Sequence, residues 1–331
     1  MISSENNAQV DVAAITVMWR QTGGMPHQLH KRSDKTPAQL LIRSIAVLNE
    51  VRQGGRAEEV VGDCDGDGHL MLWTGGNLGY GCANNVGVEW ARRLWSPRYF
   101  LVLNPDVVID QTALERLVAK ADADPELGIL GPLQQVRSGS KQVLRRGMRY
   151  FKPLSILRPV ISSGYQIDYL NGGALLIRAS ALMNEPPFAD DYFLFFEELE
   201  ICERLRRGGY QIAACEESCV IHHEGGSRGS HHDDYVPEVT EYFENLNALR
   251  FTRRNCPWWL PSVLLMRLIA KPAVLIIRRD FLRLRFWWLA VKDFICFRVR
   301  RFPFQAGWNP ALTRESLIDS AWPDFAKVRR G

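Results

Sequence analysis

The sequence lacks several features that would place it in a specialised class. Its seven cysteines are scattered without any Cys-x-x-Cys pair, which favours free thiols. The polar opening MISSENNAQVDV lacks the basic-then-apolar pattern of a signal peptide. No internal repeat or long low-complexity tract is present. With 331 residues, 46% of them hydrophobic, we expect a globular protein of one large or two modest domains in a reducing, cytoplasmic compartment.

The chain also lacks a long charge-free run. In its apolar C-terminal part the longest such run, Cys256 to Met266, has 11 residues, against roughly 20 for a bilayer-spanning helix. A transmembrane helix is therefore not expected. The net charge of +4 is unevenly spread, because residues 250–301 hold 13 lysines and arginines against two aspartates, which leaves −7 on the remainder.

This basic segment is rich in aromatic residues and has helical periodicity. Apolar side chains recur at intervals of three and four residues, at Phe281, Leu284, Trp288, Val291 and Ile295. Arg285 and Lys292 border that stripe. Aromatic rings at headgroup level and cations near anionic lipid are typical of a helix lying in the plane of a membrane surface. The alternative is a helical subdomain that packs on the catalytic core and keeps a solvated basic face.

Strands and helices are expected to alternate through the first hundred residues. Runs rich in Val, Ile, Leu and aromatics predict strands at Ala13–Trp19, Glu58–Cys64, His69–Thr74 and Arg98–Asn104. Helical spacing predicts helices at Thr36–Gln53, with Thr36 as N-cap, and at Ala83–Trp95. This rhythm predicts an α/β fold with a largely parallel sheet flanked by helices on both faces, where ligands collect at the carboxyl ends of strands.

Two motifs in this region resemble ligand-binding loops without meeting their requirements. Asp63–Gly68 reads DCDGDG, like the start of an EF-hand loop, but Thr74 stands where the bidentate Glu belongs, so calcium binding is not expected. Gly75–Gly81 reads GGNLGYG, a glycine spacing that does not match a dinucleotide fingerprint.

A proline and a carboxylate interrupt the apolar run YFLVLNPDVVID. Pro105 breaks the strand at the rim of the sheet, which would leave Asp106 pointing into the crevice. A carboxylate at that place suits Mg²⁺ or Mn²⁺ held jointly with substrate phosphates. The alternative is a turn in which Asn104 and Asp106 cap backbone groups.

Further motifs follow in order along the chain. They are NLGYGCANN from Asn77, LVLNPD, NGGALLIR from Asn171, FFEELEICERLRRGGY from Phe195 and VIHHEGGS from Val220. In this order they resemble the successive motifs of family-2 glycosyltransferases, inverting enzymes with the GT-A fold, and in particular the bacterial rhamnosyltransferase-like branch. The resemblance covers about Val12 to Ser227. It implies a GT-A type, Rossmann-like mixed sheet in a catalytic domain over residues 1–250. Residues 251–331 lie beyond the resemblance, and their composition and periodicity predict a helical, membrane-associating region.

The resemblance implies a set of residues that bind a nucleoside-diphosphate sugar. The segment that helps enclose the donor matches Asn77–Asn85, with Asn77, Gly79 and Asn84, and the glycine pair before the later strand matches Gly172 and Gly173. Either Asp63 or Asp67 occupies the acidic strand end that contacts the base or ribose. Asn104 replaces the first acid of the family's Asp-x-Asp element and would also contact the donor.

The resemblance further implies the catalytic and metal-binding residues. Asp106 matches the metal ligand and His222 the third metal-side position, with His223 as the alternative, so that Mn²⁺ or Mg²⁺ would be the cofactor. The catalytic base falls on Glu198, where the family commonly has Asp. The alternative for the acids of this segment is a first helical turn that offsets the helix dipole.

The polar stretch Gly225–Asp234 follows the proposed metal histidine directly. We expect it to close over the donor, with Arg228 reaching the diphosphate. A zinc cluster of His231 and His232 with His222 and His223 is the alternative, although the spacing fits no standard zinc pattern.

Three functions remain in competition at this level. The first is a metal-dependent glycosyltransferase, peripheral on the inner face of the plasma membrane, that uses a lipid-linked or polysaccharide acceptor in cell-envelope glycan synthesis and binds no nucleic acid. The second is a sugar nucleotidyltransferase, which would grip phosphate with the loop from Arg20 to Arg32. The third is a non-catalytic sugar- or lipid-binding relative, since Glu198 replaces the usual Asp.

Overall fold

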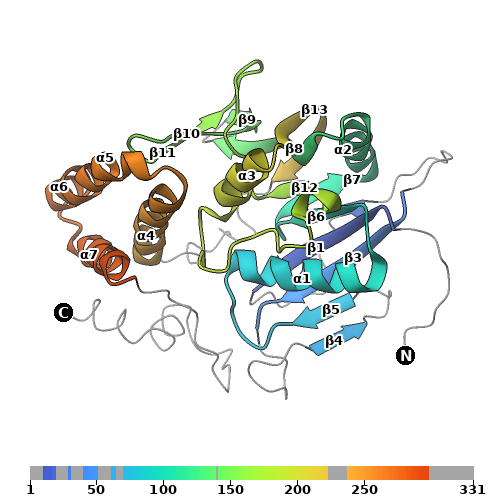
Figure 1. Cartoon of the computed structure of the whole chain (residues 1–331), viewed down its shortest axis with the longest axis horizontal. Coiled ribbons are helices and arrows are strands. Elements are labelled where there is room, and N and C mark those ends of the chain that lie inside the picture. Colours follow the sequence, from blue (N-terminus) through green and yellow to red (C-terminus); the bar gives the residue numbers. More distant parts are fainter. Residues whose placement is uncertain are drawn as a thin grey trace.

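The computed structural model describes residues 10–19, 29–30, 40–50, 61–64, 70–138, 141–222 and 237–297 (Figure 1). Within these ranges, eleven strands form one mixed sheet in the order β2-β7-β13-β8-β12-β6-β1-β3-β5-β4, with β9 paired to β8. Its strands are β1 Val12–Met18, β2 Leu29–His30, β3 Ile42–Leu48, β4 Val61–Cys64, β5 Leu70–Trp73, β6 Tyr99–Leu103, β7 Val107–Asp110, β8 Leu127–Ser138, β9 Lys141–Arg145, β12 Ala174–Arg178 and β13 Gln211–His222.

The half of the sheet around β1 is parallel. β1 pairs with β6 on one side and β3 on the other, and β3 pairs with β5, all in parallel. All seven residues of β1 are buried, as expected for a parallel strand covered on both faces. Successive residues of β1 enter two different cores: Ala13 and Ile15 lie in one, Val12 and Ala14 in the other.

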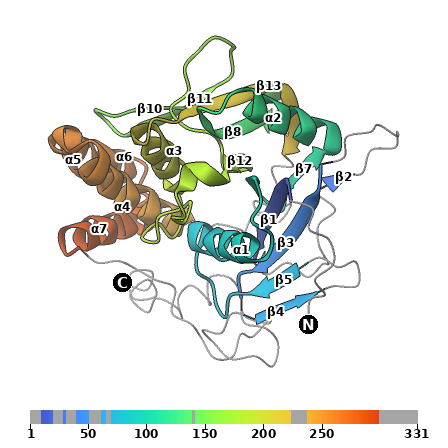
Figure 2. The same ribbon diagram turned by 45° about the vertical axis from the view of Figure 1, so that its right-hand side comes forward.

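Helices cover both faces of the sheet. α1 (Tyr80–Trp95) and α3 (Glu197–Arg207) contribute to the first core, and α2 (Gln111–Ala123) contributes to the second (Figure 2). α2 begins at Asp110, whose side chain accepts a hydrogen bond from the Ala113 N–H at 2.7 Å, a standard N-cap. The predicted α/β sheet with helices on both faces is confirmed, and so are the strands near Ala13, His69 and Arg98 and the helix near Ala83.

The helix predicted at Thr36–Gln53 is wrong, because the described part of this segment contains strand β3 instead. Its apolar residues also fit helical spacing, but β3 lies between β1 and β5 and is buried on both faces at Ile45, Ala46 and Val47. Apolar residues in such a strand form a nearly continuous run. A count of apolar residues at helical intervals therefore cannot distinguish this strand from a helix.

The other half of the sheet is mixed. β12 runs antiparallel to β6 and β8, and β13 runs parallel to β8 but antiparallel to the short β7. The two halves therefore meet between β6 and β12. The turn Asn104-Pro105-Asp106 leaves the carboxyl end of β6 at this junction.

The helical segments that the structure describes after residue 236 gather at one end of the molecule, beside α1 and α3 (Figures 1 and 2). They comprise α4 Pro237–Asn255, the stretch α5 Leu260–Leu265, the π-helical turn η3 Met266–Ala270 and α6 Lys271–Ile277, and finally α7 Phe281–Ile295. α4 and α7 share a core that includes Tyr242, Phe243 and Phe286. Inside it, the Tyr242 hydroxyl donates to Asp293 at 2.7 Å. The predicted domain boundary at residue 250 falls within α4, and the division into two domains stays a prediction.

A separate hairpin, β10 (Gly147–Phe151) with β11 (Ile156–Val160), connects the helices to the sheet. Tyr150 packs edge-on against Phe251 of α4 and against Phe196 at the start of α3. The Ser262 hydroxyl of α5 donates to the Pro153 carbonyl in the hairpin turn at 2.7 Å. The hairpin thus contacts both the start of α3 and the C-terminal helices.

One helical segment of the described chain, Pro257–Ile277, is long and apolar enough to cross a membrane by length and composition. The sequence count missed it because Arg267 and Lys271 interrupt its charge-free run. Only 17% of its apolar window is buried.

Candidate active site

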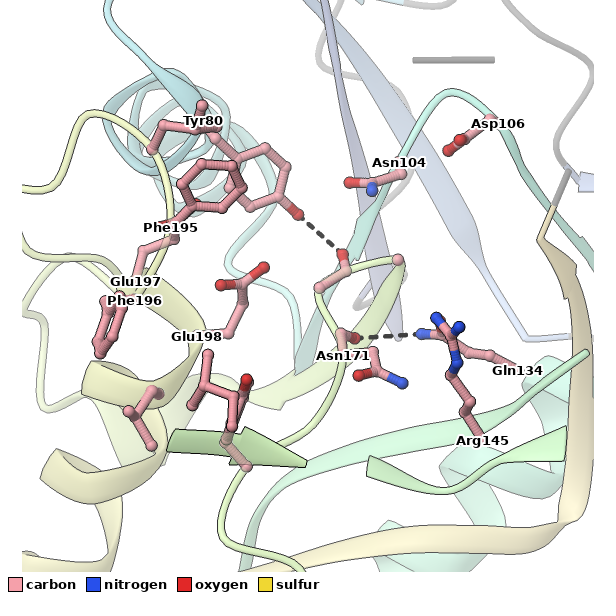
Figure 3. A pocket seen from close by; sticks show the side chains of 16 residues that line it. Tyr80, Asn104, Asp106, Gln134, Arg145, Asn171, Phe195, Phe196, Glu197 and Glu198 are labelled. Atoms are coloured by element: carbon pink, nitrogen blue, oxygen red, sulfur yellow. Dashed lines mark hydrogen bonds between the residues drawn. The ribbon is translucent and has the colours of Figure 1, made fainter. Parts of the chain in front are cut away.

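A cavity of about 270 Å³ opens where the parallel and mixed halves of the sheet meet (Figure 3). Six parts of the chain line it. They contribute Tyr80; Asn104 and Asp106; Gln134 and Arg145; Leu157; Tyr169 and Asn171–Gly173 before β12; and Leu194–Leu199 at the start of α3. The predicted residues Asn104, Asp106, Gly172, Gly173 and Glu198 are brought together here.

The turn after β6 places Asp106 in this cavity. The Asn104 N–H donates to the Gly173 carbonyl at 2.9 Å, and the Val107 N–H closes the turn on the Asn104 carbonyl at 3.1 Å. Pro105 has no N–H and stands at the break between β6 and β7, as expected at a strand end. Asp106 is only 6% exposed. The interruption of the apolar run therefore directs one buried carboxylate into the cavity.

The loop Asn171–Gly173 forms the floor between the two sides of the cavity. The Tyr80 hydroxyl donates to the Gly172 carbonyl at 2.9 Å, and the Gln134 amide donates to the Asn171 carbonyl at 3.2 Å (Figure 3). α1 and β8 thus hold this loop from opposite sides. The Cα of Gly172 faces the carboxylate of Glu198 so closely that an added Cβ would lie 2.0 Å from Oε1.

α3 starts from an unusual turn. Phe195 and Phe196 both have left-handed backbone angles, φ 68° and 76°, which cost non-glycine residues on the order of 1 kcal/mol or more each. The side-chain amide of Asn247 in α4 donates to the carbonyls of Leu194 and Phe195, at 2.8 and 3.1 Å. This buried asparagine therefore stabilises the turn that presents Glu198.

Two adjacent glutamates begin α3 in a buried setting. Burial raises the pKa of Glu198 to about 7, and burial together with the neighbouring Glu198 raises the pKa of Glu197 well above its ordinary value. Glu197 is 2% exposed, whereas Glu198 is partly open to the cavity. Glu198 is thus a carboxylate poised to exchange a proton near neutral pH.

The NLGYG segment packs next to the cavity and positions one of its walls. Asn77 accepts from the Asn49 amide and from the Gly79 N–H, both at 2.9 Å. Gly79 has φ 83°, and a Cβ there would lie 2.3 Å from the Phe193 carbonyl. Asn84 is fully buried in α1 and donates to the Tyr80 carbonyl at 3.0 Å. These three predicted donor residues do not line the cavity; they support the helix start that carries Tyr80, and their donor contacts stay predictions.

Some predicted residues lie at or beyond the limits of the described chain. The backbone of Asp63 forms part of β4, but its side chain lies outside the described residues. Asp67, His223 and Arg228 lie outside them entirely. The backbone of His222 is described and pairs with Val107, the residue after Asp106.

That strand pairing makes a metal site beside Asp106 structurally reasonable. Asp106 offers a buried oxygen ligand inside the cavity, and β13 brings the backbone of His222 alongside the same turn. Among the residues whose side chains are described, no group of three or more His, Cys, Asp or Glu could hold a metal ion. Carboxylate oxygen suits Mg²⁺ or Mn²⁺ that shares its remaining ligands with phosphates.

Sequence reasoning missed four residues of this site. Tyr80, Gln134 and Arg145 line the cavity, and Asn247 supports the turn before α3. Tyr80 lies within the NLGYG motif, so this motif could have identified it as a residue of the site. Gln134 and Arg145 come from a strand pair whose register is visible only in the structure.

Comparison with known proteins supports the same kind of enzyme. No family model matches the chain. It is 28% identical over 214 residues to the N-acetylglucosaminyl-diphospho-decaprenol L-rhamnosyltransferase of Mycobacterium tuberculosis, covering 57% of this chain and 68% of that protein. It is 24% identical over 178 residues to the rhamnosyltransferase WbbL of Escherichia coli, covering 49% and 64%.

The structural comparison concerns the fold. The crystal structure of GalNAc-T7 with UDP, GalNAc and Mn²⁺ matches with a TM-score of 0.50 and 12% identity, over 66% of this chain and 44% of that one. The sheet and its flanking helices are thus those of the GT-A fold, which confirms the expected architecture. The chain is a glycosyltransferase that resembles the rhamnosyltransferase-like branch of family 2.

Proposed function

We propose that this protein is a metal-dependent inverting glycosyltransferase that moves a sugar from a nucleoside-diphosphate donor to a hydroxyl of a lipid-linked or polysaccharide acceptor in cell-envelope glycan synthesis. The observation that carries the proposal is the shared cavity of Asp106 and Glu198, two acids 92 positions apart in the chain. A hexose such as rhamnose is the proposed sugar, in keeping with the names of the relatives.

Glu198 is the proposed general base. Its carboxylate faces the cavity on the side opposite Asn104 and Asp106 (Figure 3). An acceptor hydroxyl that attacks an anomeric carbon must lose a proton, and a carboxylate with a pKa near 7 can accept it at neutral pH. Attack from the side opposite the leaving diphosphate inverts the anomeric configuration in one step.

Asp106 and His222 are the proposed protein ligands of Mn²⁺ or Mg²⁺. When bound, such an ion supplies positive charge for the departing diphosphate. Asn104 beside Asp106 and the Gly172–Gly173 backbone on the floor line the cavity and can orient the donor. Asp63 or Asp67 is proposed to contact the nucleoside, and Arg228 the diphosphate.

The C-terminal helices are proposed to rest on the anionic inner face of the plasma membrane. Large apolar side chains are exposed on α5, η3 and α6, among them Leu265, Ile269, Ile276 and Ile277, together with Trp258 at 91% exposure. On α7 the exposed positions follow one stripe: Phe281, Arg285, Trp288, Lys292 and Ile295. Exposed aromatic and aliphatic residues mixed with cations are the composition of an interfacial surface.

The two charges inside Pro257–Ile277 favour this in-plane arrangement over a spanning one. Arg267 donates to Asn245 at 2.8 Å and to the Ser155 carbonyl at 3.1 Å, and Lys271 pairs with Glu241 at 3.0 Å. A helix that crossed the bilayer alone would lose these partners, and each charge at the bilayer centre costs at least about 2.5 kcal/mol.

The test is release of nucleoside diphosphate from a panel of dTDP-, UDP- and GDP-sugars with and without Mn²⁺. Asp106→Asn and Glu198→Gln should each reduce turnover by about 10²-fold or more, whereas the matched variant Glu203→Gln should not. Glu203 lies on the same helix but outside the cavity, paired with Lys152 at 3.5 Å. Full activity of Asp106→Asn and Glu198→Gln would refute the assignment, and nucleotide-sugar synthesis from a nucleoside triphosphate and a sugar phosphate would instead indicate a nucleotidyltransferase.

A further inference from the structure

The cavity has three charged sides rather than two. Figure 3 shows Glu198 on one side, Asn104 and Asp106 on a second, and Gln134 with Arg145 on a third. Arg145 is the one cationic side chain among the described residues that line the cavity. The proposed donor site accounts for the second side and the proposed base for the first. The third side has no part in that chemistry.

The position of Arg145 suits an anionic group carried by the acceptor. The acceptor hydroxyl must lie within hydrogen-bond reach of Glu198, so the body of the acceptor sugar extends from there across the cavity. A group attached at the far end of that sugar would point toward the wall formed by β8 and β9, where Gln134 and Arg145 are paired in register and line the same cavity as Glu198. Guanidinium groups bind phosphate oxygens through paired hydrogen bonds.

An apolar path leads outward from this wall. Leu157 of β11 lines the cavity and is 39% exposed. The turn that precedes it is bound to the apolar helices through Ser262 on Pro153, and through Arg267 on the Ser155 carbonyl at 3.1 Å. Phe151, at the other end of this turn, is 53% exposed. Hairpin β10–β11 therefore spans the distance between the cavity and the proposed membrane-resting surface.

We propose that Arg145 binds the diphosphate of a lipid-diphosphate-linked sugar acceptor, and that hairpin β10–β11, through Leu157 and Phe151, guides the first units of its hydrocarbon chain toward α5. This assignment rests on the proposed function and names the residues that would hold its lipid-linked acceptor. It explains why the sheet is joined to an exposed apolar helical surface by a hairpin whose Leu157 lines the cavity.

A donor diphosphate has the same chemistry, so the test must separate the two sources. Three reactions are compared in the full-length protein with the donor that supports turnover: donor hydrolysis without acceptor, transfer to a GlcNAc-diphosphate carrying a short polyprenyl chain, and transfer to an uncharged alkyl GlcNAc glycoside. Arg145→Gln is compared with Arg158→Gln. Arg158 is an exposed arginine of β11 that does not line the cavity.

For Arg145→Gln we expect KM for the diphosphate acceptor to rise by about 10- to 100-fold, the loss of one charge-assisted contact, with donor hydrolysis and use of the uncharged glycoside unchanged. Arg158→Gln should match the wild type in all three. Leu157→Gln should raise KM for the polyprenyl acceptor and not for the uncharged glycoside. If Arg145→Gln instead weakens the donor in the hydrolysis assay, Arg145 belongs to the donor site. Equal effects on both acceptors would also overturn the assignment. If the wild-type protein catalyses none of the three reactions, the proposed function itself is refuted.

Discussion

The Cα of Gly172 lies against the carboxylate of Glu198. A methyl group at residue 172 would sit 2.0 Å from Oε1 and 2.9 Å from Cδ of that glutamate, closer than non-bonded atoms approach. The glycine thus makes room for the carboxylate of Glu198. Gly172 lies in the loop before β12 and Glu198 in the first turn of α3, and the two fit each other as a pair.

Gly172→Ala should therefore displace Glu198 and lower kcat by at least about tenfold, while circular dichroism and the melting temperature stay close to those of the wild type. Adding Glu198→Asp should recover part of the loss, because a carboxylate shorter by one methylene withdraws from the new methyl group. The double-mutant cycle of kcat measures this coupling. Additive losses would show that the two side chains do not act on each other.

The raised pKa of Glu198 predicts the pH dependence of turnover. A general base acts only when deprotonated, so kcat/KM should increase about tenfold per pH unit up to about pH 7 and then level off. Glu198→Asp, which draws the acid back from the cavity centre, should shift the midpoint. A profile without any inflection between pH 5 and 8 would exclude Glu198 as the base.

The same raised pKa of Glu198 predicts that folding stability falls as pH rises, whereas turnover increases. The folded pKa lies above the unfolded value of about 4.5, so folding favours the protonated acid, and the stability it contributes is lost as pH rises from about 4.5 through about 7. Glu198→Gln cannot ionise. Its melting temperature should therefore exceed that of the wild type at pH 8 and match it at pH 4, as measured by differential scanning fluorimetry.

Asn247 should act on catalysis without touching substrate. Its amide holds two carbonyls of the left-handed turn before α3, and its loss leaves buried acceptors unsatisfied at about 1–3 kcal/mol. We expect Asn247→Ala to lower stability by that amount and kcat more than KM. Asn255→Ala, on the same helix but hydrogen-bonded only to the exposed Arg207 among its described side-chain contacts, is the control.

The sequence predicted the cavity in part because its chemistry is tied to strand ends. Asn104 and Asp106 follow an apolar run that could only be a buried strand, and Glu198 follows an aromatic run into a helix with strong periodicity. Such motifs predict both the type of secondary-structure element and the residue at which it begins or ends. Asp106 and Glu198, the acids on two sides of the site, both line the cavity, and their chemical roles stay predictions.

The rest of the site depends on contacts between segments that are far apart in the chain. A local sequence pattern does not predict such contacts. Arg145 enters the cavity because β9 pairs with β8 in a register that sets it opposite Gln134. Asn247 is one polar residue on a helix that is buried nearly all round, so its role shows only from the carbonyls it meets. The strand β3 was mistaken for a helix for the related reason that burial on both faces removes the alternation typical of exposed strands.

The exposed stripe of α7 gives the last prediction. Trp288 is 57% exposed, between Arg285 and Lys292 on the same face. Trp288→Glu removes an apolar anchor and adds a repelling charge, and should weaken binding to liposomes containing phosphatidylglycerol by about tenfold or more. Leu94→Glu, a similar change at a 37% exposed site on α1, should leave binding unchanged. Co-sedimentation at two salt concentrations provides the measurement, because attraction between cations and anionic lipid weakens with salt. Equal binding by wild type and Trp288→Glu would make this stripe an ordinary solvated face.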